Sequence, residues 1–194
     1  MLKDESAWCV ADARMTIRAA VEDDAQAFFD YRSDPRTQRF VSRLTASPQE
    51  AREQIDSQRA DEHAVRSAIE VDGRVVGDIG GSFRRPGSLG DAPDLWDFQI
   101  GYCVDPEMWG RGIATTAVGL FTSLLHETFC VRRIVGMVFE DNRASSRVLL
   151  KNGYRLEGTE IAAVLDRDGV WLNDCRFAHL AGDGVDRGLE GQHA

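Results

Sequence analysis

The stretch Trp109-Gly110-Arg111-Gly112-Ile113-Ala114-Thr115 decides the fold prediction. It follows residues 98–104, where apolar and small residues alternate as in a β-strand, and it opens residues 111–127, where apolar residues recur at helical spacing. Glycines two residues apart let the backbone approach a bulky anion, and the unpaired N–H groups of a helix's first turn point at that anion. The stretch therefore predicts a diphosphate-binding turn between a strand and a helix.

Two better-known phosphate motifs do not fit this turn. No Gly-Lys-Ser/Thr ends it, and Thr115 stands where a dinucleotide-binding fingerprint needs its third glycine. Taken alone, the turn is equally compatible with an ordinary glycine-rich connection.

A second informative segment runs from Asn142 to Tyr154, with Glu157-Gly158 just beyond it. An amide and a hydroxyl three residues apart, at Asn142 and Ser145, are typical of a helix N-cap. The spacing predicts a helix over 145–152, and Gly153 stands where a left-handed residue would end it.

The remaining pattern alternates helices and strands without an internal repeat. Ser47, Pro48 and Glu50 predict a capped helix start, and Asp72-Gly73 predicts a tight hairpin turn. The other elements expected are helices over 23–32 and 47–59 and strands over 16–18, 68–71, 74–76, 133–139, 154–157, 161–165 and 170–180.

Composition narrows the class of protein. The 194 residues favour one domain, which we expect over 15–180, with flexible extensions at 1–14 and in the glycine-rich 181–194. A net charge of -9 argues against nucleic-acid binding. The four cysteines and four histidines show no metal-site spacing, and no transmembrane segment or signal peptide is apparent. We therefore expect a cytoplasmic protein with neither a metal nor a membrane partner.

In order and spacing, these motifs resemble the GNAT N-acetyltransferase superfamily, in particular its RimJ/RimL branch of ribosomal-protein alanine acetyltransferases. The resemblance covers nearly the whole predicted domain and rests on Ile17-Arg18, Glu22 to Ala25, Ser33-Asp34-Pro35, Ile100-Gly101-Tyr102, Asp105-Pro106, the 109–115 turn, Asn142, Ser145, Lys151 to Tyr154 and Glu157-Gly158. It implies an α/β (α+β) fold: a mixed, mostly antiparallel sheet of about six to seven strands, flanked by about four helices, with a splayed strand pair for CoA.

The resemblance also implies acetyl-CoA as the acyl donor. Its pyrophosphate would contact the backbone N–H groups from Arg111 to Ala114 and the Thr115 hydroxyl, and its pantetheine arm would lie along Tyr102-Cys103-Val104. Asn142 would hydrogen-bond this arm, and Ser145 would lie near the sulfur. The cofactor-binding residues expected are thus Tyr102, Cys103, Val104, Trp109, Gly110, Arg111, Gly112, Ile113, Ala114, Thr115, Asn142 and Ser145.

The implied chemistry is direct attack of an amine on the thioester. Many relatives protonate the leaving thiolate with a tyrosine of the second motif, but Leu150 stands at that position, so Ser145 inherits the role, with Asn142 beside it. The two positions where relatives carry a general-base glutamate hold Met137 and Val164. The acids left near strand ends are Asp97, Glu140, Asp166 and Asp174. Cys103 lies on the strand expected to face the thioester, and it is interpreted as a packed residue rather than a nucleophile.

The acceptor expected from the resemblance is a protein N-terminal α-amine. A small-molecule amine, such as an aminoglycoside or polyamine, and a different donor, such as succinyl-CoA, remain alternatives. A CoA-binding or interaction module without turnover is a third, because the family tyrosine and glutamates are missing. A homodimer is expected by resemblance only.

Overall fold

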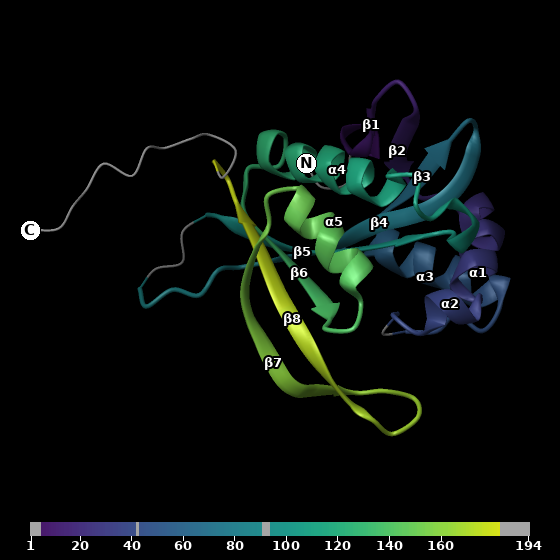
Figure 1. Cartoon of the computed structure of the whole chain (residues 1–194). Coiled ribbons are helices and arrows are strands. Elements are labelled where there is room, and N and C mark those ends of the chain that lie inside the picture. Colours follow the sequence, from purple (N-terminus) through teal and green to yellow (C-terminus); the bar gives the residue numbers. More distant parts are fainter. Residues whose placement is uncertain (1–4, 42, 91–93, 183–194) are drawn as a thin grey trace, which may run out of the picture.

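The computed structural model describes residues 5–41, 43–90 and 94–182, and its strands form one sheet in the order β1-β2-β3-β4-β5-β6-β8-β7 (Figure 1). Neighbouring strands are antiparallel except β5 and β6, which are parallel. The strands are β1 (Val10–Ala11), β2 (Met15–Ala19), β3 (Ala64–Val71), β4 (Arg74–Arg84), β5 (Trp96–Val104), β6 (Val131–Phe139), β7 (Arg155–Leu165) and β8 (Trp171–Leu180).

Helices cover both faces of the sheet (Figure 1). The α-helices of the described residues are α1 (Ala25–Arg32), α2 (Pro35–Gln38), α3 (Pro48–Ala60), α4 (Ile113–Glu127) and α5 (Arg143–Lys151). The apolar stripe of α4, with Ala117, Phe121 and Leu125 fully buried, packs on one face together with α5. On the other face α1 and α3 enclose a smaller apolar cluster that includes Phe28 and Ile55.

The sheet has eight strands where six to seven were expected, and the described chain has five α-helices where about four were expected. The extra elements are short: β1 has two residues and α2 has four, which is too few for periodicity to reveal. One predicted break is wrong. Residues 155–165 form the single strand β7, in which the register shift between Glu160 and Val164 bends the ladder without ending it.

The capping signals of α3 have a physical basis in the structure. The Ser47 Oγ accepts the Glu50 N–H at 3.1 Å, and the Glu50 carboxylate accepts the Ala46 N–H at 2.7 Å. The carboxylate thus reaches one residue further back than in the usual capping box.

Within the predicted extension over 1–14, the residues around Trp8 pack against the core. Glu5–Trp8 form a 3-10 helix, and the Trp8 side chain, 3% exposed, stacks on Phe129 with ring centroids 3.9 Å apart. Burying one aromatic side chain removes about 150–250 Å² from water, which contributes about 4–6 kcal/mol to the free energy of folding by area. The average composition of a segment does not reveal such a single residue. Residues 1–4 and all but the first two residues of the predicted 181–194 tail lie outside the described residues.

The parallel pair β5–β6 separates toward its carboxyl ends. Paired residues run from Trp96 and Val131 to Ile100 and Gly136, and none follow, although both strands continue. The predicted splayed pair is therefore confirmed. Among the described residues, no helix has the length and apolarity needed to cross a bilayer.

Candidate functional site

The glycine-rich turn adopts the left-handed backbone that its sequence requires. Gly110 and Gly112 have φ angles of 75° and 80°, and Gly112 is the N-cap of α4. The helix ladder starts with the Thr116 N–H, which donates to the Gly112 carbonyl at 3.0 Å, so the N–H groups before it have no acceptor within the helix. A Cβ built at either glycine meets nothing within 4 Å. The turn thus presents free donors to open space.

Trp109 fixes this turn to the end of β5. Its indole Nε1–H donates to the Val104 carbonyl at 2.8 Å, while about half of the side chain stays exposed. This hydrogen bond therefore fixes the distance between the N–H donors at the start of α4 and the unpaired end of β5.

Asn142 and Ser145 lie at the start of α5, across the splay from β5. The Asn142 Oδ1 accepts the Ser145 N–H at 3.1 Å, so this side chain caps the helix. Its amide N–H₂ is a donor that the cap does not use. Both residues line the same cavity.

The phenol of Tyr102 reaches Ser145 from β5. Its Oη lies 2.7 Å from the Ser145 Oγ and donates to the Ser145 carbonyl at 3.1 Å. Burial raises the pKa of Tyr102 to about 12, so the phenol stays protonated at neutral pH. Leu150, where many relatives carry a tyrosine, is 53% exposed. The tyrosine hydroxyl beside Ser145 thus comes from β5, and the sequence pattern had indicated only cofactor binding for Tyr102.

Cys103 points away from the splay. Its thiol is buried in the cluster beneath α1 and α3, and this burial raises its pKa to about 12. A thiolate nucleophile is therefore disfavoured at neutral pH, in agreement with the packed-residue interpretation.

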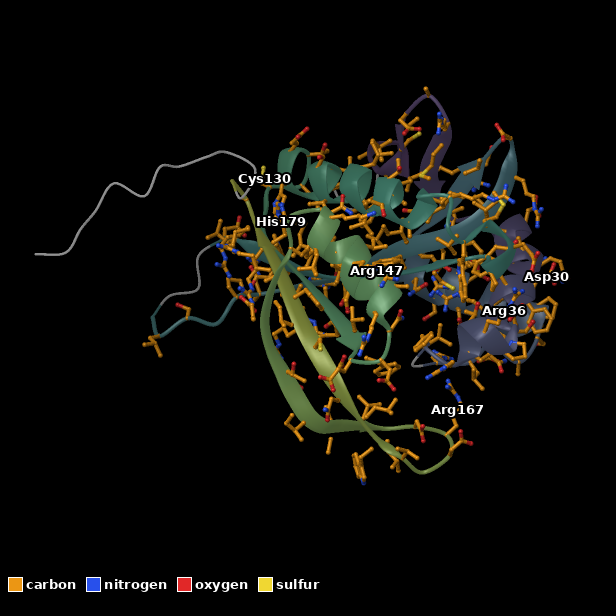
Figure 2. All side chains as sticks on the ribbon, in the orientation of Figure 1. Asp30, Arg36, Cys130, Arg147, Arg167 and His179 are labelled. Carbon is orange, nitrogen blue, oxygen red and sulfur yellow. The ribbon has the colours of Figure 1, made fainter. Side chains whose placement is uncertain are left out.

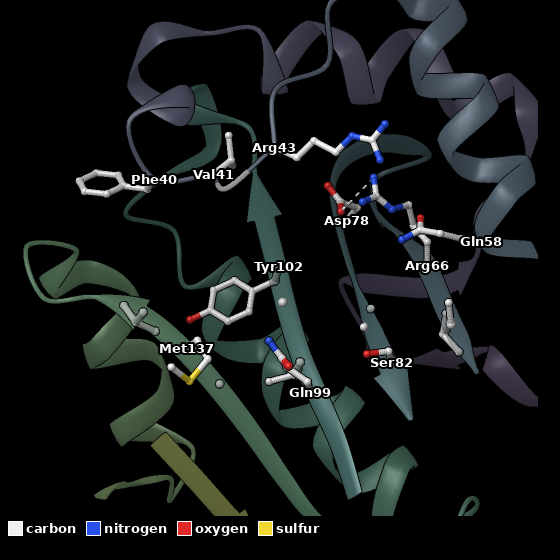
Figure 3. A pocket seen from close by; sticks show the side chains of 18 of the residues that line it. Phe40, Val41, Arg43, Gln58, Arg66, Asp78, Ser82, Gln99, Tyr102 and Met137 are labelled. Atoms are coloured by element: carbon white, nitrogen blue, oxygen red, sulfur yellow. Dashed lines mark ion pairs between the residues drawn. The ribbon is translucent and has the colours of Figure 1, made fainter. Parts of the chain in front are cut away.

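A cavity of about 730 Å³ opens between the helices α1–α3 and the splayed strands (Figure 3). Tyr102 and Met137 reach one side of it, and Arg66 and Asp78 lie on the other. The glycine turn at 109–115 does not line this cavity. The turn with free N–H donors and the cavity are therefore two separate parts of the site. The splayed strands β5 and β6 lie between them.

Of the four candidate general bases, Asp174 on β8 is the one that lines the cavity. The other three carboxylates lie outside the cavity lining and accept hydrogen bonds, although the Asp97 Oδ1 is, like the Asp174 Oδ1, buried without a partner among the described residues. Asp97 accepts from Arg132 at 2.9 Å, Glu140 accepts from Asn173 at 2.8 Å, and Asp166 accepts the backbone N–H groups of the β7–β8 turn.

The Asp174 carboxylate is partly buried, and the backbone N–H groups of Val138 and Cys175 hydrogen-bond to it. Its Oδ1 is buried without a hydrogen-bond partner among the described residues. Burial, together with the negative charge of Glu160 on β7, raises the pKa of Asp174, and Arg176 opposes that shift. Asp174 pairs with Phe139 of β6, so it shares a face with Met137, two residues earlier on that strand. A carboxylate thus lies one strand away from the position where relatives carry a glutamate.

A buried ionic cluster, which the sequence analysis also missed, forms the other end of the cavity. Asp78 on β4 accepts from the Tyr31 hydroxyl at 2.7 Å and from two Arg32 nitrogens at 3.0 and 2.6 Å. Although burial disfavours the charged form, the guanidinium groups of Arg32 on α1 and Arg66 on β3 keep the pKa of Asp78 below its ordinary value. No local motif marks this cluster, because its members come from α1, β3 and β4.

The tip of the β7–β8 hairpin closes onto the segment after α2. Arg167 donates to the carbonyls of Gln38 and Val41, both at 2.8 Å, and Figure 2 shows its side chain directed from the hairpin toward that segment. Since Val41 lines the cavity, the hairpin supports its rim.

Comparison with known proteins agrees with this geometry. Residues 14–155 match the model of the acetyltransferase (GNAT) domain. The chain therefore belongs to the GNAT acetyltransferases, a family of acyl-CoA-dependent enzymes. A curated relative, the uncharacterized N-acetyltransferase YoaA of Bacillus subtilis, is 40% identical over 60 residues, which span 31% of this chain and 34% of that protein.

Solved structures share the whole fold. RimL, a ribosomal L7/L12 α-N-protein acetyltransferase solved with coenzyme A, superposes with a TM-score of 0.78 at 19% identity, covering 90% of this chain and 99% of that one. RimJ of Mycobacterium smegmatis, in complex with CoA-disulfide, gives 0.75 at 22% identity over 89% and 84% of the two chains. At these identities the similarity establishes the fold, which confirms the GNAT expectation.

Proposed function

We propose that this protein transfers the acetyl group of acetyl-CoA to a protein N-terminal α-amine. The observation that carries the proposal is the arrangement of three parts: a turn with free N–H donors, a pair of splayed strands and a cavity lined by the Asp174 carboxylate. The α-amine is favoured because the RimL and ribosomal-protein-S5-alanine acetyltransferase structures share the fold.

The donor site fits an extended thioester with a diphosphate at one end. The N–H groups at the start of α4 would bind the diphosphate, and the Thr115 hydroxyl adds a donor. Beyond Ile100 the backbone of β5 has no partner in β6, so a pantetheine arm can pair with it as an added strand. A β5 backbone N–H would then polarise the thioester carbonyl.

The residues of the cavity account for both proton transfers. Asp174, directly or through one water, takes a proton from the neutral amine as its nitrogen bonds to the acetyl carbon. As the carbon–sulfur bond breaks, the departing thiolate takes a proton from the Ser145 hydroxyl. The Tyr102 hydroxyl, 2.7 Å away, passes its proton to Ser145 in the same step; the phenolate then regains a proton from water, and Asp174 releases to water the proton that it took. The products are the N-acetyl amide and free CoA.

Acetyl-CoA binding tests the donor site. At about 100 times Kd the ligand adds about 2.7 kcal/mol to the free energy of unfolding, which raises Tm by about 5–10 °C for a domain of this size. We expect Gly112→Val to lose this shift, because its side chain would project into the anion site. Gly169→Val is the matched control, since Gly169 has the same φ of 80° and the same open surroundings in the β7–β8 turn. If ATP raises Tm as acetyl-CoA does, or if Gly112→Val keeps the wild-type shift, the assignment fails.

Ser145→Ala tests the leaving-group role. The variant keeps the helix cap, which uses the Ser145 backbone N–H, and removes the hydroxyl. We expect kcat with a peptide acceptor to fall by about 10²-fold, the lower end of the range for acid catalysis, while the Kd for acetyl-CoA stays within about twofold. An unchanged kcat would remove Ser145 from the mechanism and leave Tyr102 as the donor.

A further inference from the structure

The ionic cluster in the cavity has an unequal number of cations and anions. Asp78 accepts hydrogen bonds from Tyr31 and Arg32, and a second guanidinium, that of Arg66 on β3, lies beside it (Figure 3). The Arg66 Nη1 is 3.7 Å from the Asp78 Oδ2, which is too long for a hydrogen bond. Two guanidinium groups therefore share one carboxylate.

Arg66 is mostly buried and poorly paired. Its side chain is 15% exposed and stacks over the Phe28 ring at 5.6 Å, and its guanidinium donates no hydrogen bond to another described residue. Burial lowers the pKa of Arg66, because Asp78 compensates its charge only in part. A buried cation with unused donors is costly unless an anion completes its coordination. At the rim, by contrast, Arg43 lies 3.5 Å from Glu50.

The sheet register connects Arg66 to the splay. Arg66 pairs with Gly80 of β4, and Gly80 pairs with Gly101 of β5, so the three residues form one row across the sheet. Partners in such a row share a face, and neither glycine has a side chain to block it. Two strand spacings of about 4.8 Å separate Arg66 from Gly101, about 10 Å in all. Gly101 directly precedes Tyr102, which contacts Ser145.

Building on the proposed N-acetylation, we propose that the acceptor is a peptide N-terminus with a carboxylate side chain within its first four residues, and that Arg66 binds this carboxylate. An extended chain advances about 3.3 Å per residue, so three residues cover the row from the splay to Arg66. Gln58 of α3, whose Oε1 is buried without a partner among the described residues, also lines the cavity and can accept a peptide N–H.

The test compares acceptor peptides that differ in one residue. Each pair carries Glu or Gln at position 2, 3 or 4 and is otherwise identical. For at least one position we expect kcat/KM to be about 10- to 100-fold higher with Glu, through a lower KM, as is usual for a charge-assisted hydrogen bond. Arg66→Met should bring this Glu/Gln ratio close to one, and Arg66→Lys should give an intermediate ratio. Arg52→Met, which removes an arginine of α3 that pairs with Glu22, should keep the wild-type ratio.

Three results would overturn the inference. Equal kcat/KM for Glu and Gln peptides at every position in the wild-type protein would refute it while leaving N-acetylation intact. Retention of the wild-type ratio by Arg66→Met would exclude Arg66 as the anion site, and if that variant does not fold, retention of the full ratio by Arg66→Lys would exclude it instead. Acetyl-CoA binding without acetylation of any peptide would reject the proposed acceptor class, and with it this inference.

Discussion

Asp174→Asn lowers kcat for peptide acetylation by about 10²- to 10⁴-fold at neutral pH, the usual contribution of a general base. The amide has nearly the same shape as the carboxylate but cannot take the proton of the attacking amine. Acetyl-CoA affinity should stay unchanged, because Asp174 lies in the cavity and not at the glycine turn.

Stability separates this role from a structural one. The pKa of Asp174 is raised in the folded protein, so its ionised form opposes folding above that pKa. Neutralising it by Asn should therefore leave Tm unchanged or raise it. A loss of activity together with a large fall in Tm would mean that the residue is structural.

The pH profile gives a second check. The acidic limb of kcat/KM reports ionisation of the base, and the raised pKa places this limb above the ordinary range for an aspartate. Glu160→Gln removes a nearby negative charge from β7 but leaves the charge of Arg176, so the limb should move to lower pH. A limb that does not move would assign the base to another group.

Arg32→Met destabilises the protein by about 3–5 kcal/mol at neutral pH, the cost of leaving a buried charge without its partner. Asp78 would keep the Tyr31 hydrogen bond and the longer 3.7 Å ion pair with Arg66, but would lose both short bonds to Arg32. Denaturant unfolding measures this loss. Arg52→Met is the control, because its exposed ion pair with Glu22 contributes less than about 1 kcal/mol.

The sign of the pH dependence follows from Asp78. Its folded-state pKa is lowered, so the stability it contributes is present above its unfolded pKa and is lost as pH falls through the folded pKa. In Arg32→Met the carboxylate can take a proton at higher pH than in the wild type. The stability difference between the two proteins should therefore shrink as the pH falls toward 4. A difference that is constant with pH would indicate lost packing around Arg32 instead of lost charge pairing.

Local signals in the sequence were sufficient for much of the fold. Three features depend only on residues close together in the sequence, and each forms as predicted: the 109–115 turn, the cap at Ser47 and the Asp72-Gly73 hairpin. Elements that depend on distant partners were missed. Glu5–Trp8 is ordered by Phe129, and no pattern near Trp8 indicates this contact.

The candidate site likewise has residues that local sequence predicts and residues that only the folded structure brings together. The sequence placed Asn142 and Ser145 at the start of a helix, but it offered four acids for the base without a means of choosing among them. Asp174 is distinguished by its register against Phe139 and by its place in the cavity lining, which the other three do not share. Likewise, the cluster of Arg32, Arg66 and Asp78 exists only after three separate segments have come together.

The stack of Trp8 on Phe129 also bears on how the chain folds during its synthesis. A ribosome must release the residues through Phe129 before Trp8 finds the ring that buries it. Until then the indole lacks its stacking partner and has Phe83 and Phe121 to contact, and contacts of such long sequence separation form slowly. The Trp8 indole therefore stays partly uncovered until Phe129 has been synthesised, and a chaperone that binds exposed aromatic side chains would protect it in that interval.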